Sequence, residues 1–133
     1  MTVRQWSVAV GGALLLNVLA GLECLSFTGT REAGQQQLAL GRDLYAAHCG
    51  GCHGADLEGQ PNWHAQLPNG RLPAPPLDAT GHAHHHSDEE LFRVVKEGME
   101  GVSPGRPSDM PAFAEILSNE EISAVISFIK TSW

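Results

Sequence analysis

The sequence predicts an all-α domain of three to five short helices joined by long loops. A Ser followed three residues later by a Glu occurs at Ser87 and again at Ser118, and each copy precedes an apolar run with helical spacing. No stretch alternates polar and apolar side chains with the period of two that a strand requires. The 133 residues include 15 glycines and 8 prolines, which favour long connecting loops.

The sequence of residues 1–26 is typical of a secretory signal peptide or a membrane anchor, so we expect this segment to lie outside the domain. One basic residue, Arg4, precedes a nearly all-apolar stretch over residues 8–20. Small residues precede two candidate cleavage sites, after Ala20 and after Ser26.

An uncleaved anchor is the alternative, because residues 6–22 reach the lower limit of length for a membrane span. With either outcome the folded domain comprises residues 27–133. We expect it in the periplasm or on the outer face of the cytoplasmic membrane.

The first helix of the domain is predicted over residues 35–53. Leu38, Leu44 and Tyr45 have helical spacing there, and the helix runs into a pair of cysteines. The segment that follows, residues 54–86, carries five prolines and is predicted to be mostly loop.

Two further helices are predicted after this loop. One begins at the Ser87 cap and stops at Gly98, and a loop over residues 101–111 follows it. The last begins at the Ser118 cap. Its apolar stripe consists of Ile122, Val125, Ile126 and Ile129.

The chemistry is concentrated at Cys49-Gly50-Gly51-Cys52-His53. This C-x-x-C-H pattern is typical of covalent c-type haem attachment. Two thiols separated by two residues reach the two vinyl groups of one porphyrin, and the adjacent His53 ring faces the iron from the same side. A redox dithiol needs a βαβ frame, and a zinc site normally needs a second ligand pair; the sequence predicts neither.

The second axial position of such an iron decides between electron transfer and ligand chemistry. Met110 lies in a loop before the last helix and is followed by Pro111, so it has no helix face to fill. Met99 is the other methionine candidate. An open position would instead indicate a haem enzyme or a gas sensor.

From about residue 37 onward the chain resembles a small bacterial monohaem cytochrome c of the single-domain, all-helical kind. Gly41, Tyr45 and Cys49 follow one another at intervals of four, and Phe128 lies on the last helix. The resemblance implies that the first and last helices cross at these residues. It also implies that a few short helices wrap around one covalently bound haem c.

The same resemblance assigns the axial ligands. His53 and Met110 would hold the iron, and the carbonyl of Pro75 would accept a hydrogen bond from His53. A six-coordinate iron of this kind carries single electrons between redox protein partners, including membrane complexes. A haem subunit of a larger dehydrogenase, reductase or oxidase is the alternative. The residues predicted to line the pocket are Trp63, Leu72, Leu77, Phe92, Val95 and Phe113.

Four histidines, His82, His84, His85 and His86, go beyond the pattern of that family. They indicate an exposed loop, a copper, zinc or nickel site in a metal-handling protein, or a replacement for Met110 on the iron. We expect an extended backbone here. His85 would then point to the side opposite the other three.

Charge limits the choice of partner. The net charge is −7, so nucleic acid is excluded, because phosphate binding needs clustered Lys and Arg. The only lysines are Lys96 and Lys130, too few to steer the domain toward an acidic partner. Apolar contact or a basic partner fits better.

Overall fold

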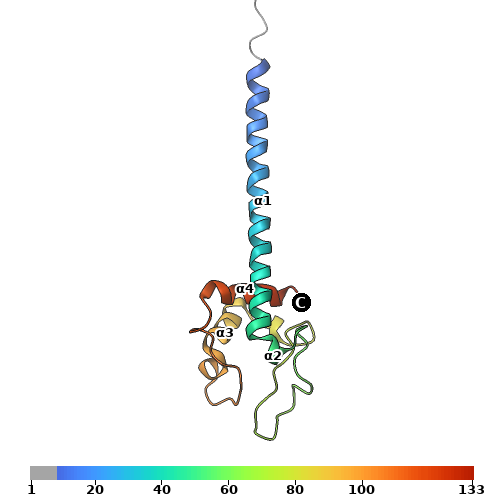
Figure 1. Ribbon diagram of the computed structural model, residues 1–133, viewed down its shortest axis with the longest axis vertical. Coiled ribbons are helices and arrows are strands. Elements are labelled where there is room, and N and C mark those ends of the chain that lie inside the picture. Colours follow the sequence, from blue (N-terminus) through green and yellow to red (C-terminus); the bar gives the residue numbers. More distant parts are fainter. Residues whose placement is uncertain (1–8) are drawn as a thin grey trace, which may run out of the picture. The chain divides into compact units, whose positions relative to one another are not determined.

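The computed structural model describes the backbone of residues 9–133 and the side chains from residue 29 onward. Within that part of the chain there are four α-helices, one short 3-10 helix and no strand, so the all-α prediction is confirmed (Figure 1). The helices are α1 (Ala9–His48), α2 (Gly50–His53), the 3-10 helix η1 (Ala83–His85), α3 (Asp88–Val102) and α4 (Asn119–Lys130).

Helix α1 begins earlier than the sequence predicts, at Ala9 rather than near residue 35. The chain divides into two units, residues 1–35 and residues 36–133, and the second unit carries the site. The predicted signal peptide or anchor, residues 1–26, lies outside the residues whose side chains are described. From residue 29 onward, no helix is long and apolar enough to cross a membrane.

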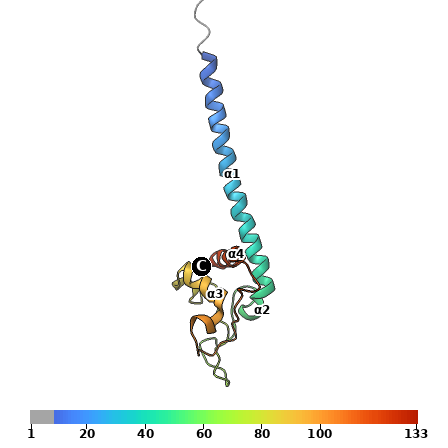
Figure 2. The same ribbon diagram turned by 90° about the vertical axis from the view of Figure 1, so that its left-hand side faces the viewer.

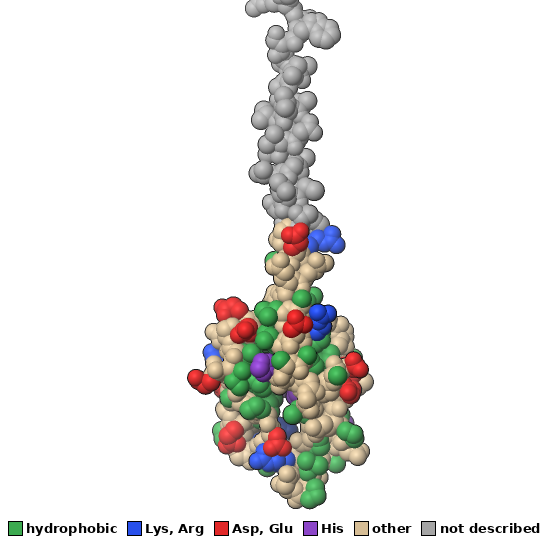
Figure 3. Space-filling view, in the orientation of Figure 1, with side chains coloured by type: hydrophobic (Ala, Val, Ile, Leu, Met, Phe, Trp, Pro, Cys, Tyr) green, Lys and Arg blue, Asp and Glu red, His purple; other side chains and the backbone are tan. Residues whose placement is uncertain are grey.

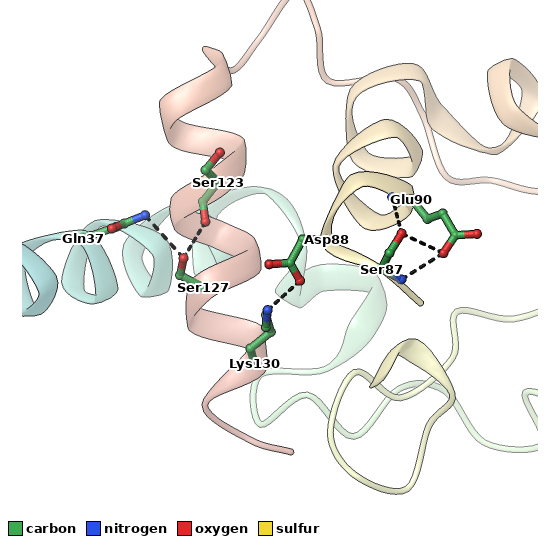
Figure 4. Close-up of polar contacts among 7 residues, drawn as sticks. All are labelled: Gln37, Ser87, Asp88, Glu90, Ser123, Ser127 and Lys130. Atoms are coloured by element: carbon green, nitrogen blue, oxygen red, sulfur yellow. Dashed lines mark hydrogen bonds and ion pairs between the residues drawn. The ribbon is translucent and has the colours of Figure 1, made fainter. Parts of the chain in front are cut away.

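Both predicted capping boxes are confirmed. Ser87 Oγ accepts a hydrogen bond from the Glu90 backbone N–H, while the Glu90 carboxylate accepts one from the Ser87 N–H at 2.8 Å (Figure 4). Ser118 and Glu121 repeat the arrangement at the start of α4. Each box satisfies backbone donors that the first helical turn leaves without partners, which fixes where the helix begins.

The helical run that begins at Asp88 is interrupted at Gly98, where the sequence predicts its stop. Gly98 has non-helical angles, φ 69° and ψ 174°, and a second short helical segment then completes α3 as far as Val102. This left-handed conformation is one that glycine adopts without strain. A Cβ at this position would also lie 2.6 Å from the Ala112 backbone nitrogen. The glycine therefore allows the loop before α4 to approach α3 closely.

Helices α1 and α4 cross within the second unit, as Figures 1 and 2 show. A Cβ on Gly41 would lie 2.0 Å from the Ala124 carbonyl oxygen, so only a glycine permits this approach. The Tyr45 and Phe128 rings lie beside the crossing, with centroids 5.5 Å apart. The predicted crossing of the N- and C-terminal helices is therefore present.

Polar contacts support the same arrangement (Figure 4). Gln37 donates a hydrogen bond to Ser127 Oγ at 3.3 Å, which links α1 to α4. Lys130 Nζ lies 2.5 Å from an Asp88 carboxylate oxygen, which links α4 to α3. These contacts are exposed, so each contributes at most about 1 kcal/mol to stability.

The hydrophobic core consists of two clusters that share α4. In the first, Val125 and Ile129 pack with Tyr45 and Leu57. In the second, Ile122 and Ile126 pack with Phe113 and Leu117. The four stripe positions of α4 predicted from the sequence are all buried. Burial of each such side chain contributes about 1.5–3 kcal/mol, so α4 is the main packing element of the domain.

The crossing gives a first testable prediction. Gly41→Ala should lower the free energy of unfolding by on the order of 3 kcal/mol, because the new methyl group overlaps backbone that cannot move aside. Gly34→Ala is the matched control, since nothing lies within 4 Å of a Cβ there. Urea unfolding followed by circular dichroism measures both, and equal stability of the two variants would contradict the close crossing.

Candidate haem site

The C-x-x-C-H segment forms one helical turn at the end of α1. Cys49 N–H donates to the Tyr45 carbonyl at 2.8 Å, and the His53 N–H donates to the Cys49 carbonyl at 2.9 Å. Cys49 is half-buried, Cys52 is exposed, and neither forms a disulfide. The two thiols and the imidazole therefore come from one short, hydrogen-bonded turn.

The His53 ring is fixed by a backbone carbonyl. Its Nδ1 lies 2.8 Å from the Pro75 oxygen, so the tautomer that donates this bond carries its proton on Nδ1 and leaves a lone pair on Nε2. Burial lowers the pKa of His53 below its ordinary value, and the hydrogen bond to Pro75 opposes that shift. The imidazole is therefore neutral at pH 7, the form that binds a metal.

Backbone hydrogen bonds hold the segment around Pro75 against the turn that follows α2. Gln60 N–H donates to the Ala74 carbonyl at 2.9 Å, and Leu77 N–H donates to the Leu57 carbonyl at 2.8 Å. The C-terminal residue also contributes, since Trp133 Nε1 donates to the Leu77 carbonyl at 2.9 Å. The Pro75 carbonyl is therefore placed by hydrogen bonds to the main chain on both sides of it.

Met110 is half-buried in the loop between α3 and α4. Its carbonyl accepts a hydrogen bond from the Met99 N–H at 3.3 Å, and the Phe113 N–H donates to the Val95 carbonyl at 3.1 Å. Met99 itself lies within α3. The Met110 loop is thus tied to α3, next to the Gly98 kink.

The predicted pocket residues fall into separate environments. Phe113 is buried, with Phe92 and Val95 packed against its cluster. Leu77 packs against the Tyr45 cluster. Leu72 and Trp63 are half-buried in the long loop.

The histidine segment differs from the prediction. Its backbone forms the 3-10 helix η1 instead of the extended conformation that the sequence predicts, so the expected alternation of side chains is wrong. The rings pair as His82 with His86, centroids 5.7 Å apart, and as His84 with His85, 4.1 Å apart. Trp63 stacks on His82 at 5.5 Å. Two backbone hydrogen bonds of 3.1 Å close this turn, from the His85 N–H to the His82 carbonyl and from the His86 N–H to the Ala83 carbonyl.

The four histidines do not form a three-ligand cluster. From residue 29 onward, no three His, Cys, Asp or Glu side chains are arranged to hold a metal ion. The pKa of His82 is lowered, first by burial and then by the charges of His86, Arg106, His85 and His64.

One contact near Met110 could not have been predicted from the sequence. Arg71, in the long loop, donates from Nη1 to the Ser108 carbonyl at 2.7 Å and forms an ion pair with Asp109. Arg71 and Asp109 lie 38 positions apart in the sequence, and no motif connects them.

The chemistry of the donor set fits a covalently attached haem. Burial and the neighbouring Cys52 raise the pKa of the Cys49 thiol to about 11. A redox dithiol requires the opposite shift, so this pair is not poised for disulfide exchange. Two free thiols beside a neutral, oriented imidazole are the groups that attach haem c and bind its iron.

A small all-helical domain that carries this turn is typical of haem-binding electron-transfer proteins. The family model of cytochrome c matches residues 38–133. The chain therefore belongs to the cytochrome c family, and it binds haem c covalently and transfers electrons with redox partners. No curated protein matches the sequence.

Proposed function

We propose that residues 27–133 form a monohaem cytochrome that carries single electrons, with His53 and Met110 as the axial ligands. The observation that carries this proposal is the hydrogen bond between His53 Nδ1 and the Pro75 carbonyl, because it leaves Nε2 available to iron. The chain contains one C-x-x-C-H motif, which indicates one haem. The bound haem supplies an iron that alternates between ferrous and ferric states.

The residues around the ligands keep the two oxidation states alike in structure. The Pro75 carbonyl prevents rotation of His53 and increases its basicity toward the metal. The backbone contacts of the Met110 loop restrict movement of the thioether, and a thioether ligand raises the reduction potential. If His53 and Met110 both held the iron, no substrate would reach it, and the domain would change no chemical bond itself.

The surface supports docking by apolar contact or with a basic partner. Carboxylate side chains are spread over the face shown in Figure 3, whereas Lys and Arg are sparse there. Both lysines already have partners, since Lys130 pairs with Asp88 and Lys96 Nζ donates to Asn119 at 3.1 Å. The proposed docking therefore does not use a ring of cationic side chains, which would attract an acidic oxidase.

The proposed location is the periplasm or the outer face of the cytoplasmic membrane. Support comes from the sequence of residues 1–26, which has the pattern of a signal peptide or anchor. If the anchor is retained, residues 6–22 tether the domain near membrane redox complexes.

A potentiometric titration of the purified holoprotein tests the function. The absorbance of the reduced haem should follow a one-electron Nernst curve, with a slope of about 59 mV per decade. The reduced protein should not bind carbon monoxide, because its sixth position is occupied. Rapid carbon monoxide binding by the wild type would instead indicate an open-site enzyme or sensor.

The same titration tests whether the histidines of residues 82–86 contribute to the haem site. Replacing His82, His84, His85 and His86 by Ala should leave the midpoint potential and spectrum nearly unchanged. A large shift would place this segment at the iron.

A further inference from the structure

Arg71 connects two loops that are far apart in the sequence. Its Nη1 donates to the Ser108 carbonyl at 2.7 Å and pairs with the Asp109 carboxylate. Ser108 and Asp109 are the two residues immediately before Met110. Water screens the ion pair with Asp109, because the two side chains are 41% and 68% exposed, whereas the hydrogen bond to the Ser108 carbonyl is partly buried.

The backbone around Arg71 is held by its own hydrogen bonds. Leu67 N–H donates to the Arg71 carbonyl at 2.8 Å, and Gly70 N–H donates to the Leu67 carbonyl at 2.8 Å. The Asn69 side chain accepts a hydrogen bond from the Arg71 N–H at 3.0 Å. These contacts form a tight turn, so the guanidinium extends from a fixed base.

The two sides of Met110 are held in different ways. After Met110, the chain is tied to α3 by the backbone bond from Phe113 to Val95. Before Met110, the Ser108 hydroxyl accepts a hydrogen bond from the Met110 N–H at 3.1 Å, and the Ser108 carbonyl accepts from Arg71. A charged donor to a backbone carbonyl is among the stronger hydrogen bonds in proteins.

We propose that Arg71 is a positioning residue that holds the Met110 loop so that the thioether stays on the iron. The long loop between α2 and η1 thereby controls how readily the axial ligand leaves, although it supplies no ligand on that side. This inference rests on the proposed role of Met110.

The test compares cyanide binding to the ferric holoprotein, because cyanide enters only when Met110 dissociates. Arg71→Gln should bind cyanide about tenfold faster than the wild type, and its near-infrared sulfur-to-iron band should disappear at a lower pH. Arg42→Gln is the matched control. It removes the same charge from an exposed pair with Asp43, distant in sequence from both loops, and should behave like the wild type.

Two milder variants keep the test decisive if Arg71→Gln folds poorly. Arg71→Lys should bind cyanide at a rate between those of the wild type and Arg71→Gln. Both contacts of Arg71 use the same nitrogen, Nη1, which an ammonium group can replace. Asp109→Asn should give a smaller acceleration, since the hydrogen bond to Ser108 remains.

The outcomes separate this proposal from the assignment of Met110. If the wild type lacks the near-infrared band, Met110 is not the ligand, and the proposed function needs a different sixth ligand to the iron. If the wild type has the band but Arg71→Gln and Arg42→Gln bind cyanide at the same rate, Arg71 does not position the loop.

Discussion

Replacement of either motif cysteine should abolish stable haem retention. In the wild type, haem should stay with the polypeptide through acid–acetone extraction, because thioether bonds survive that treatment. With Cys49→Ala or Cys52→Ala, one covalent link is lost, and little intact holoprotein should accumulate. Pyridine haemochrome spectra of the extracted polypeptide measure the result.

The control for this experiment is Cys24→Ala. Cys24 lies outside the motif, so this variant should retain haem like the wild type. Complete extraction of haem from the wild type would contradict covalent attachment. Full retention in both motif variants would show that the thiols are not the attachment points.

Replacement of Met110 should have the second largest effect. The oxidised wild type should show the weak near-infrared sulfur-to-iron band, and Met110→Ala should eliminate it. The reduced variant should bind carbon monoxide. Its midpoint potential should fall by about 0.1–0.3 V, within the roughly 0.8 V range that axial ligands control.

Met99→Ala is the matched control, because Met99 is also a half-buried methionine but lies within α3. Its band and potential should stay close to those of the wild type. If Met99→Ala removes the band and Met110→Ala does not, the ligand assignment has to be exchanged between the two.

Features encoded by neighbouring residues were accessible from the sequence. The C-x-x-C-H turn is contiguous, and each capping box spans four positions, so local chemistry determines them. The buried stripe of α4 follows from helical periodicity. The partner of His53 was inferred from a family resemblance, and the structure places Pro75 at that position.

Features that depend on distant contacts were not accessible. Arg71 meets Ser108 and Asp109 only after two loops have folded against each other, and nothing local in either loop indicates this. Gly98 interrupts α3 as the sequence predicts, but neither the short helical segment after it nor the close approach of Ala112 could be foreseen. Histidine spacing alone did not reveal that Trp63 stacks on His82 and that the segment forms a turn.

The sharing of α4 by both core clusters has a consequence for the order of events during biogenesis. A chain emerges from the ribosome with its N-terminus first, so Cys49 and Cys52 appear before residues 119–130. Neither cluster can close until that last segment arrives. During this interval Tyr45 has no Phe128 to pack against, and the burial that raises the pKa of the Cys49 thiol is incomplete. We therefore expect the thioether bonds to form on this open chain, before the final helix packs against α1.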